Sequence, residues 1–68
     1  MNHYLSFYKS TIRGEISTLN AEIDRLKLIV ADAKDCNKPL LEEEARIQIQ
    51  NCLCKIRVCN DNLDKLDK

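Results

Sequence analysis

The sequence predicts an all-α protein in which two long amphipathic helices fold back on each other as an antiparallel hairpin. Three observations predict it. Apolar residues recur every three or four positions in two long stretches, and Pro39 separates these stretches. The chain has 68 residues with one glycine and one proline, which is too few turn formers for a many-stranded sheet. We expect the hairpin to be coiled-coil-like and to dimerise into a four-helix bundle.

The first helix is expected over residues 4–34. Its apolar positions step by four and then by three, which is the 3.5-residue period of a coiled coil. We count Ile16 as position a of the heptad abcdefg. Gly14 then falls at position f, which faces solvent, where it costs about 1 kcal/mol relative to alanine. The a and d positions hold Ile12, Ile16, Leu19, Ile23, Leu26, Val30 and Ala33.

A turn is expected over residues 35–39. Pro39 cannot continue the first helix, but it fits the first turn of a second one. Asn37 is a suitable N-cap residue for that second helix. The acidic run 42–44 lies in its opening turns, where the helix dipole favours negative charge.

The second helix is expected over residues 40–66, and the whole chain forms one helical-hairpin domain. Its apolar row alternates large residues with small ones, which lets two backbones approach closely. Because the connection is short, we expect the two helices to be antiparallel. The row holds Ala45, Ile49, Cys52, Ile56, Cys59, Leu63 and Leu66.

Both apolar stripes are wider than their a and d positions. Tyr8 and Ile29 fall at g in the first helix, and Leu41 at g and Leu53 at e in the second. A stripe of this width is typical of a helix that contacts two neighbours in a four-helix bundle. A 68-residue chain also has only a marginal core of its own, and small folds of this kind commonly add a partner chain.

We therefore expect a homodimer. The alternatives are a hairpin that docks onto a different protein, a larger helical oligomer, and a parallel two-stranded coil in which Glu22 pairs with Lys27 of the other chain. The residues predicted to form the core or the oligomer interface are Ile12, Ile16, Leu19, Ile23, Leu26, Val30, Ala45, Ile49, Cys52, Leu53, Ile56, Cys59 and Leu63.

Four apolar residues fit neither seam: Leu28, Ile47, Cys54 and Val58. Ile47, Cys54 and Val58 are spaced seven and four apart, so they line one outer strip of the second helix. Scattered surface hydrophobes are common and are the simpler interpretation. The alternatives are a docking strip for another protein and an error in the heptad phase.

A polar row recurs every seven residues along one edge of the first helix: Arg13, Asn20, Lys27 and Lys34. These side chains are suited to contacts with phosphates or bases. They are also the ordinary content of an e position in a helix bundle, and we prefer this interpretation.

We expect the cysteines to pack as small apolar residues rather than to bind a metal ion or act as nucleophiles. Cys52 and Cys54 point about 200° apart on a helix, so they cannot hold one metal ion. Cys52 and Cys59 fall in the expected core, where reduced thiols act as small apolar residues. Cys36 lies in the turn and is the thiol expected to be exposed; we prefer an incidental turn residue over a reactive or disulfide-forming one. A cysteine nucleophile needs a neighbouring base, and no motif surrounds His3, the single histidine. We expect no metal, no cofactor and no enzymatic activity.

Eleven basic and eleven acidic residues cancel, so the chain lacks the overall field that attracts nucleic acid or anionic lipid. It has no apolar run of about 20 residues that would span a membrane, and its start lacks the pattern of a secretory signal. We expect a cytoplasmic, non-enzymatic protein–protein interaction module that works as a homodimer. A regulator or adaptor of this kind would suit a phage or plasmid accessory protein that acts on host machinery. The alternatives are a nucleic-acid-binding hairpin dimer and a structural assembly subunit.

Overall fold

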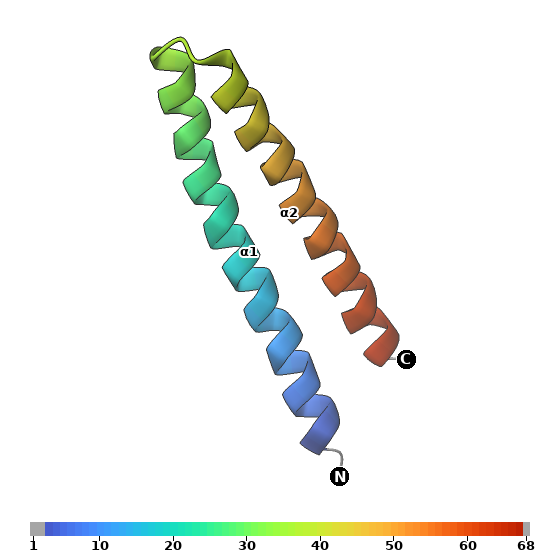
Figure 1. Cartoon of the computed structure of the whole chain (residues 1–68). Helices are drawn as coiled ribbons and strands as arrows, with labels where there is room; N and C mark the ends of the chain where they lie inside the picture. Colours follow the sequence, from blue (N-terminus) through green and yellow to red (C-terminus); the bar gives the residue numbers. More distant parts are fainter. Residues whose placement is uncertain (1–2, 68) are drawn as a thin grey trace.

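The computed structural model describes residues 3–67 and consists of two long antiparallel helices joined by a short turn (Figure 1). Helix α1 spans His3–Asp35 and helix α2 spans Pro39–Leu66. The ranges expected from the sequence are 4–34 and 40–66. The described residues contain no strand, and the two helices pack against each other along their length. The prediction of an all-α hairpin is confirmed.

The turn is built around Asn37, whose φ of 59° lies in the left-handed region. The amide of Asn37 donates to the carbonyl of Lys34 over 3.2 Å, and the amide of Lys38 donates to the carbonyl of Ala33 over 2.8 Å. This pair of bonds is a Schellman motif, which satisfies the last free carbonyls of α1. Asparagine suits the position because it tolerates the left-handed conformation better than most residues.

The prediction that Asn37 caps α2 is therefore wrong. Lys38 occupies the N-cap position, and no side chain makes a capping hydrogen bond there. Asn37 ends α1 instead, one residue too early to cap α2. Pro39 is the first residue of α2, as its fixed φ and missing amide favour. Glu42 lies in the first turn, where its charge is favourable to the helix dipole.

The core is a thin seam between the helices. Leu26 and Ala33 are the most deeply buried residues, each with 2% of its surface exposed. In α2 the buried residues are all small, namely Ala45, Cys52 and Cys59. Partly buried aliphatic residues pack against this seam: Leu19, Ile29, Val30, Ile49 and Ile56.

The hairpin is a rod rather than a globule. Its Cα extents are 56 × 15 × 10 Å and its radius of gyration is 15.8 Å, whereas a compact domain of this length has a radius of about 11 Å. Both termini lie at the end opposite the turn, and the N-terminal part of α1 extends past the end of α2 (Figure 1). Two helices alone leave most of each helix surface in water.

Candidate interaction surface

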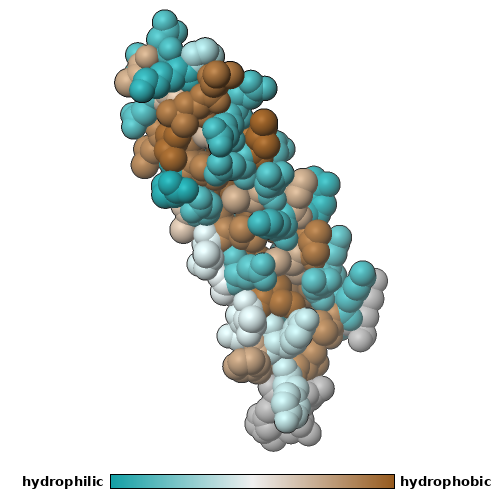
Figure 2. Space-filling model, viewed as in Figure 1, coloured by the Kyte–Doolittle hydropathy of each residue, from teal (hydrophilic) through white to brown (hydrophobic). Residues whose placement is uncertain are grey.

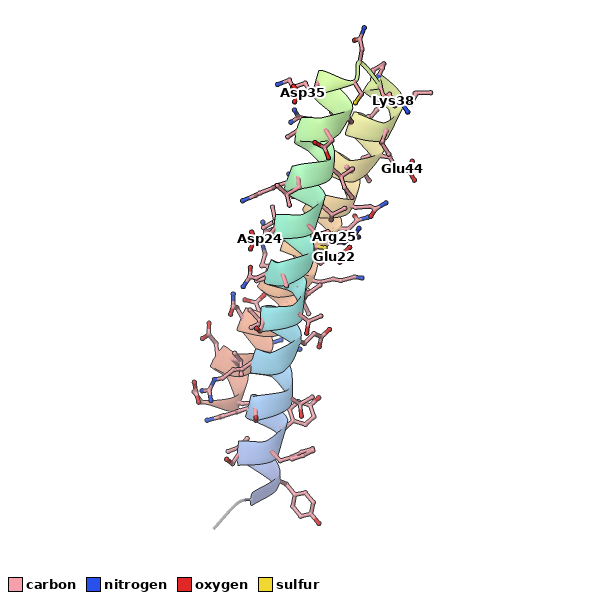
Figure 3. All side chains as sticks on the ribbon, turned by 90° about the vertical axis from the view of Figure 1, so that its left-hand side faces the viewer. Glu22, Asp24, Arg25, Asp35, Lys38 and Glu44 are labelled. Carbon is pink, nitrogen blue, oxygen red and sulfur yellow. The ribbon has the colours of Figure 1, made fainter. Side chains whose placement is uncertain are left out.

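The hairpin has two long sides, which differ in the heptad positions they carry. Around a helix, e lies next to a, and g lies next to d. We call the side with the a rows and the e positions the a side, and the opposite side the d side. Glu22, at g, and Arg25 point toward the viewer's side of Figure 1, whereas Asp24 points the other way (Figure 3). Figures 1 and 2 therefore show the d side.

The d side is largely closed. Its apolar d positions are buried, apart from half-buried Leu5, Leu19 and Leu66. Polar Glu15 and Lys55 flank them at g, as do the exposed apolar residues Tyr8 and Leu41. Hydrophobic side chains gather over both helices near the turn, and polar ones interrupt them toward the chain ends (Figure 2). The buried d residues are Ile12, Leu26, Ala33, Ala45, Cys52 and Cys59.

The a side is open by comparison. Ile23 is the one buried residue among its described apolar a positions. Leu53, at the neighbouring e position, has 44% of its surface exposed. The remaining aliphatic residues of the two a rows are all half-buried: Ile16, Val30, Ile49, Ile56 and Leu63. An apolar stripe thus runs along the a side with one edge in water.

Every residue predicted to form the core or the oligomer interface lies on one of these two sides. The predicted residues at d are buried, apart from half-buried Leu19. Those at a are half-buried, apart from buried Ile23. Leu53 is exposed. The sequence pattern alone did not distinguish the closed side from the open one.

The predicted outer strip is exposed throughout, but the structure brings only part of it together. Cys54 and Val58 line one shallow depression beside Lys55. Ile47 borders a different depression, nearer the turn. Leu28 belongs to α1 and is 69% exposed. The surface shared by Cys54 and Val58 is what remains of the predicted strip.

The polar row forms the basic edge of the a side, and all four of its residues are exposed: Arg13, Asn20, Lys27 and Lys34. Near its start, Lys9 donates a hydrogen bond to the carboxylate of Asp67. This bond, the charge of Lys9 and the more distant charge of Arg13 together hold the pKa of Asp67 below its usual value. The row therefore borders an apolar stripe rather than forming a separate basic patch.

Sequence reasoning missed one surface, at the N-terminal end of α1. Tyr4, Phe7 and Tyr8 are 88%, 73% and 59% exposed. Their i, i+3, i+4 spacing puts all three on one face of α1, and this spacing was a signal available in the sequence. Tyr4 and Tyr8 also border a depression with Leu66 at the end of α2.

The thiols divide into two exposed and two buried groups. Cys36 and Cys54 are exposed, and Cys52 and Cys59 are buried. Burial raises the pKa of the Cys59 thiol, and the nearby carboxylate of Glu15 raises it further. Cys59 is thus held in its protonated form, the opposite of an activated nucleophile.

The part of the chain that the structure describes contains neither a group of possible metal ligands nor a membrane-spanning helix. Within residues 3–67 no three histidine, cysteine or acidic side chains gather where they could hold a metal ion, the side chain of His3 lying outside the described part. Neither α1 nor α2, over its described length, has an apolar stretch sufficient to cross a bilayer.

No protein-family model matches this chain, and comparisons with curated proteins and with solved structures find no match either.

Proposed function

We propose that this chain is a non-enzymatic helical interaction module of the cytoplasm, a regulator or adaptor, that works as a homodimer. In the dimer, the a sides of two hairpins pack together as a four-helix bundle. The observation that carries the proposal is the half-buried state of the aliphatic a rows beside exposed Leu53. The exposed surface area of the hairpin supports a second copy as the partner that covers them.

The hairpin exposes 5488 Å² of surface. A compact folded protein of 7.9 kDa exposes about 4,400 Å². The excess is on the order of 1,000 Å², and a stable dimer typically buries about 800 Å² on each partner. A side with Cα extents of 56 × 15 Å has a footprint of similar size. Covering one long side by an identical hairpin therefore removes about as much surface as a standard interface needs.

The d side is a poorer candidate for this interface. Its central residues are already buried, and Glu22 and Arg25 form an ion pair on its flank. The hydrogen bond from Arg25 lowers the pKa of Glu22, so the pair is ionised at neutral pH. The a side carries two ion pairs of its own, Lys9 with Asp67 and Glu42 with Arg46, so the choice between the two sides depends on the half-buried aliphatic a rows.

Two leucines of α2 make a matched test of the interface. Leu53 lies on the a side and Leu41 on the d side, and each is 44% exposed. We expect light scattering to give twice the 7.9 kDa chain mass for the wild type. Leu53→Glu should reduce the mass to that of a monomer, because it buries two unpaired carboxylates per dimer. Leu41→Glu should leave the dimer intact.

A folded wild-type monomer at tens of micromolar would overturn the proposal. A dimer that survives Leu53→Glu but dissociates with Leu41→Glu would move the interface to the d side.

The surface left for a protein partner is then the outer face of α2, where Cys54 and Val58 share a depression. Val58 is 57% exposed and at position c, away from the a side. Val58→Glu should leave both the helix content and the dimer mass unchanged. It is therefore the variant with which to ask whether a bound partner is lost.

A further inference from the structure

One exposed face of α1 contributes to neither the seam nor the a side. It consists of the c and f positions, which point away from the seam, and Figure 3 looks onto it because α1 is the left-hand helix of Figure 1. An exposed helix face normally carries charged residues. This one carries none over residues 4–21. We call it the outer face of α1; its residues there, all exposed, are Tyr4, Phe7, Thr11, Gly14, Thr18 and Ala21.

The outer face of α1 is large at its N-terminal end and small beyond it. Tyr4 and Phe7 are 88% and 73% exposed. A Cβ added at Gly14 would meet nothing within 4 Å, so the centre of the face is open. The hydroxyls of Thr11 and Thr18 donate to the carbonyls of Phe7 and Gly14, each over 3.0 Å. Both hydroxyl donors are thus satisfied within α1, and covering the face would leave neither of them unpaired.

The large and small residues are placed symmetrically about Gly14. On the f row, Phe7 and Ala21 each lie seven residues from it, and on the c row Thr11 and Thr18 lie three and four residues away. If a second α1 crosses antiparallel with Gly14 over Gly14, Phe7 of each copy lies over Ala21 of the other, about 10 Å from the crossing. A parallel α1 would set ring against ring and leave a gap between the two alanines.

We infer that the outer face of α1 binds the same face of a second copy, antiparallel and centred on Gly14. A contact around a two-fold axis has to be complementary to itself. A large residue that faces a small one, twice, gives complementarity of this kind. The contact is separate from the a side. Where the a sides also pair as proposed, each dimer carries two outer faces of α1, and dimers join into longer assemblies.

The charges around the outer face of α1 are compatible with this pairing. Glu15 lies at g, toward α2, where it borders a depression formed by residues of that helix. Arg25 is the first charged residue on the c row, and in the antiparallel pair it lies level with Tyr4 of the other copy. A guanidinium stacks favourably on an aromatic ring, and Arg25 remains bonded to Glu22 in its own chain.

The area of the contact indicates a weak association. A buried aromatic side chain covers about 150–250 Å². Tyr4 and Phe7 therefore offer on the order of 300 Å² per copy at their observed exposure. A stable dimer buries about 800 Å² on each partner. We expect this pairing to form at hundreds of micromolar, well above the concentrations at which the a sides are proposed to pair.

Sedimentation equilibrium of the Leu53→Glu chain tests the contact without the a side. The measured quantity is the rise in mass between about 10 μM and about 1 mM, so it does not depend on the species present at the lower concentration. We expect the mass to double over this range. Phe7→Ala should raise the dissociation constant about tenfold, because it removes the ring from both contacts. Ala21→Phe should raise it similarly, because two rings then collide.

The double variant Phe7→Ala/Ala21→Phe is the sharpest test. It exchanges the large and small residues, so antiparallel pairing about Gly14 should return to within about threefold of the parent. Leu28→Ala is the matched control. Leu28 is on the same row and 69% exposed, but in the pair it lies past His3, where the other α1 begins. Its loss should change the dissociation constant less than about twofold.

The results decide this inference separately from the proposed function. A mass that does not rise, a double variant no better than Phe7→Ala, or equal effects of Phe7→Ala and Leu28→Ala would each overturn the inference. A wild type that is monomeric at tens of micromolar, but whose mass doubles near 1 mM and responds to Phe7→Ala, would contradict the homodimer and support the outer face of α1.

Discussion

The turn offers a sharp test of how the hairpin is specified, because one residue adopts a conformation that most side chains avoid. Asn37 has a φ of 59°. The left-handed conformation costs an ordinary L-residue about 1–2 kcal/mol, and it is most unfavourable for a β-branched one. We expect Asn37→Val to lower the free energy of unfolding by roughly this amount. Asn37→Gly should raise it by about 0.5 kcal/mol, since the larger backbone freedom of glycine in the unfolded chain offsets part of the gain.

The assay is thermal unfolding followed by circular dichroism at 222 nm. For a domain of this size, 1 kcal/mol shifts the midpoint by about 4–8 °C. Asn37→Val should therefore lower the midpoint by roughly 4–16 °C, and Asn37→Gly should raise it by about 2–4 °C. All variants must be compared at one protein concentration, because the proposed association with a second chain would make the midpoint depend on concentration.

The neighbouring turn residue supplies the control. Cys36 is exposed, and Asn37 is the one non-glycine residue with positive φ in residues 3–67. Cys36→Val should thus change the midpoint by only a few degrees. Equal midpoints for Asn37→Val and Cys36→Val, or a loss of stability in Asn37→Gly, would refute the assignment of Asn37 as the left-handed end of α1.

Two further predictions concern single residues of the helices. Gly14→Ala should raise the free energy of unfolding by about 1 kcal/mol, because a Cβ there meets nothing within 4 Å; an unchanged midpoint would mean that this part of α1 is not helical in solution. Alkylation by iodoacetamide should modify Cys36 and Cys54 rapidly and Cys52 and Cys59 slowly, as read by peptide mass spectrometry. If all four thiols react at one rate, the seam is not packed as described.

The period of the apolar residues and the position of the single proline were sufficient to predict the fold. The unbroken spacing from Ile12 to Ala33 specified one helix, and Pro39 marked where the next begins. The small residues at Cys52 and Cys59 were correctly placed in the core, because a thiol packs like a small apolar group.

The capping of the turn was not predictable from residue preferences alone. Asparagine is favoured both as an N-cap and in the left-handed position that ends a helix. The two roles lie one or two residues apart around a short turn, so the sequence supports either for Asn37. The choice depends on which carbonyls of α1 need partners, and backbone geometry decides that.

The candidate site was predicted only in outline, for a related reason. Heptad letters identify which residues lie near a seam, but they treat its two sides alike. The structure separates them because the d row of α2 is small. Ala45 and Cys52 allow α1 to come close on the d side, where large residues such as Leu26 are then covered.

The same small residues explain why one aliphatic row of the hairpin is only half-buried. Because α1 settles against the small d row of α2, the d side closes, and the larger a residues of α2 are left at the opposite edge. Ile49, Ile56 and Leu63 are half-buried there, next to exposed Leu53. The small d row therefore favours close pairing within the chain and, by the same geometry, leaves the large a residues of α2 half-buried at the opposite edge.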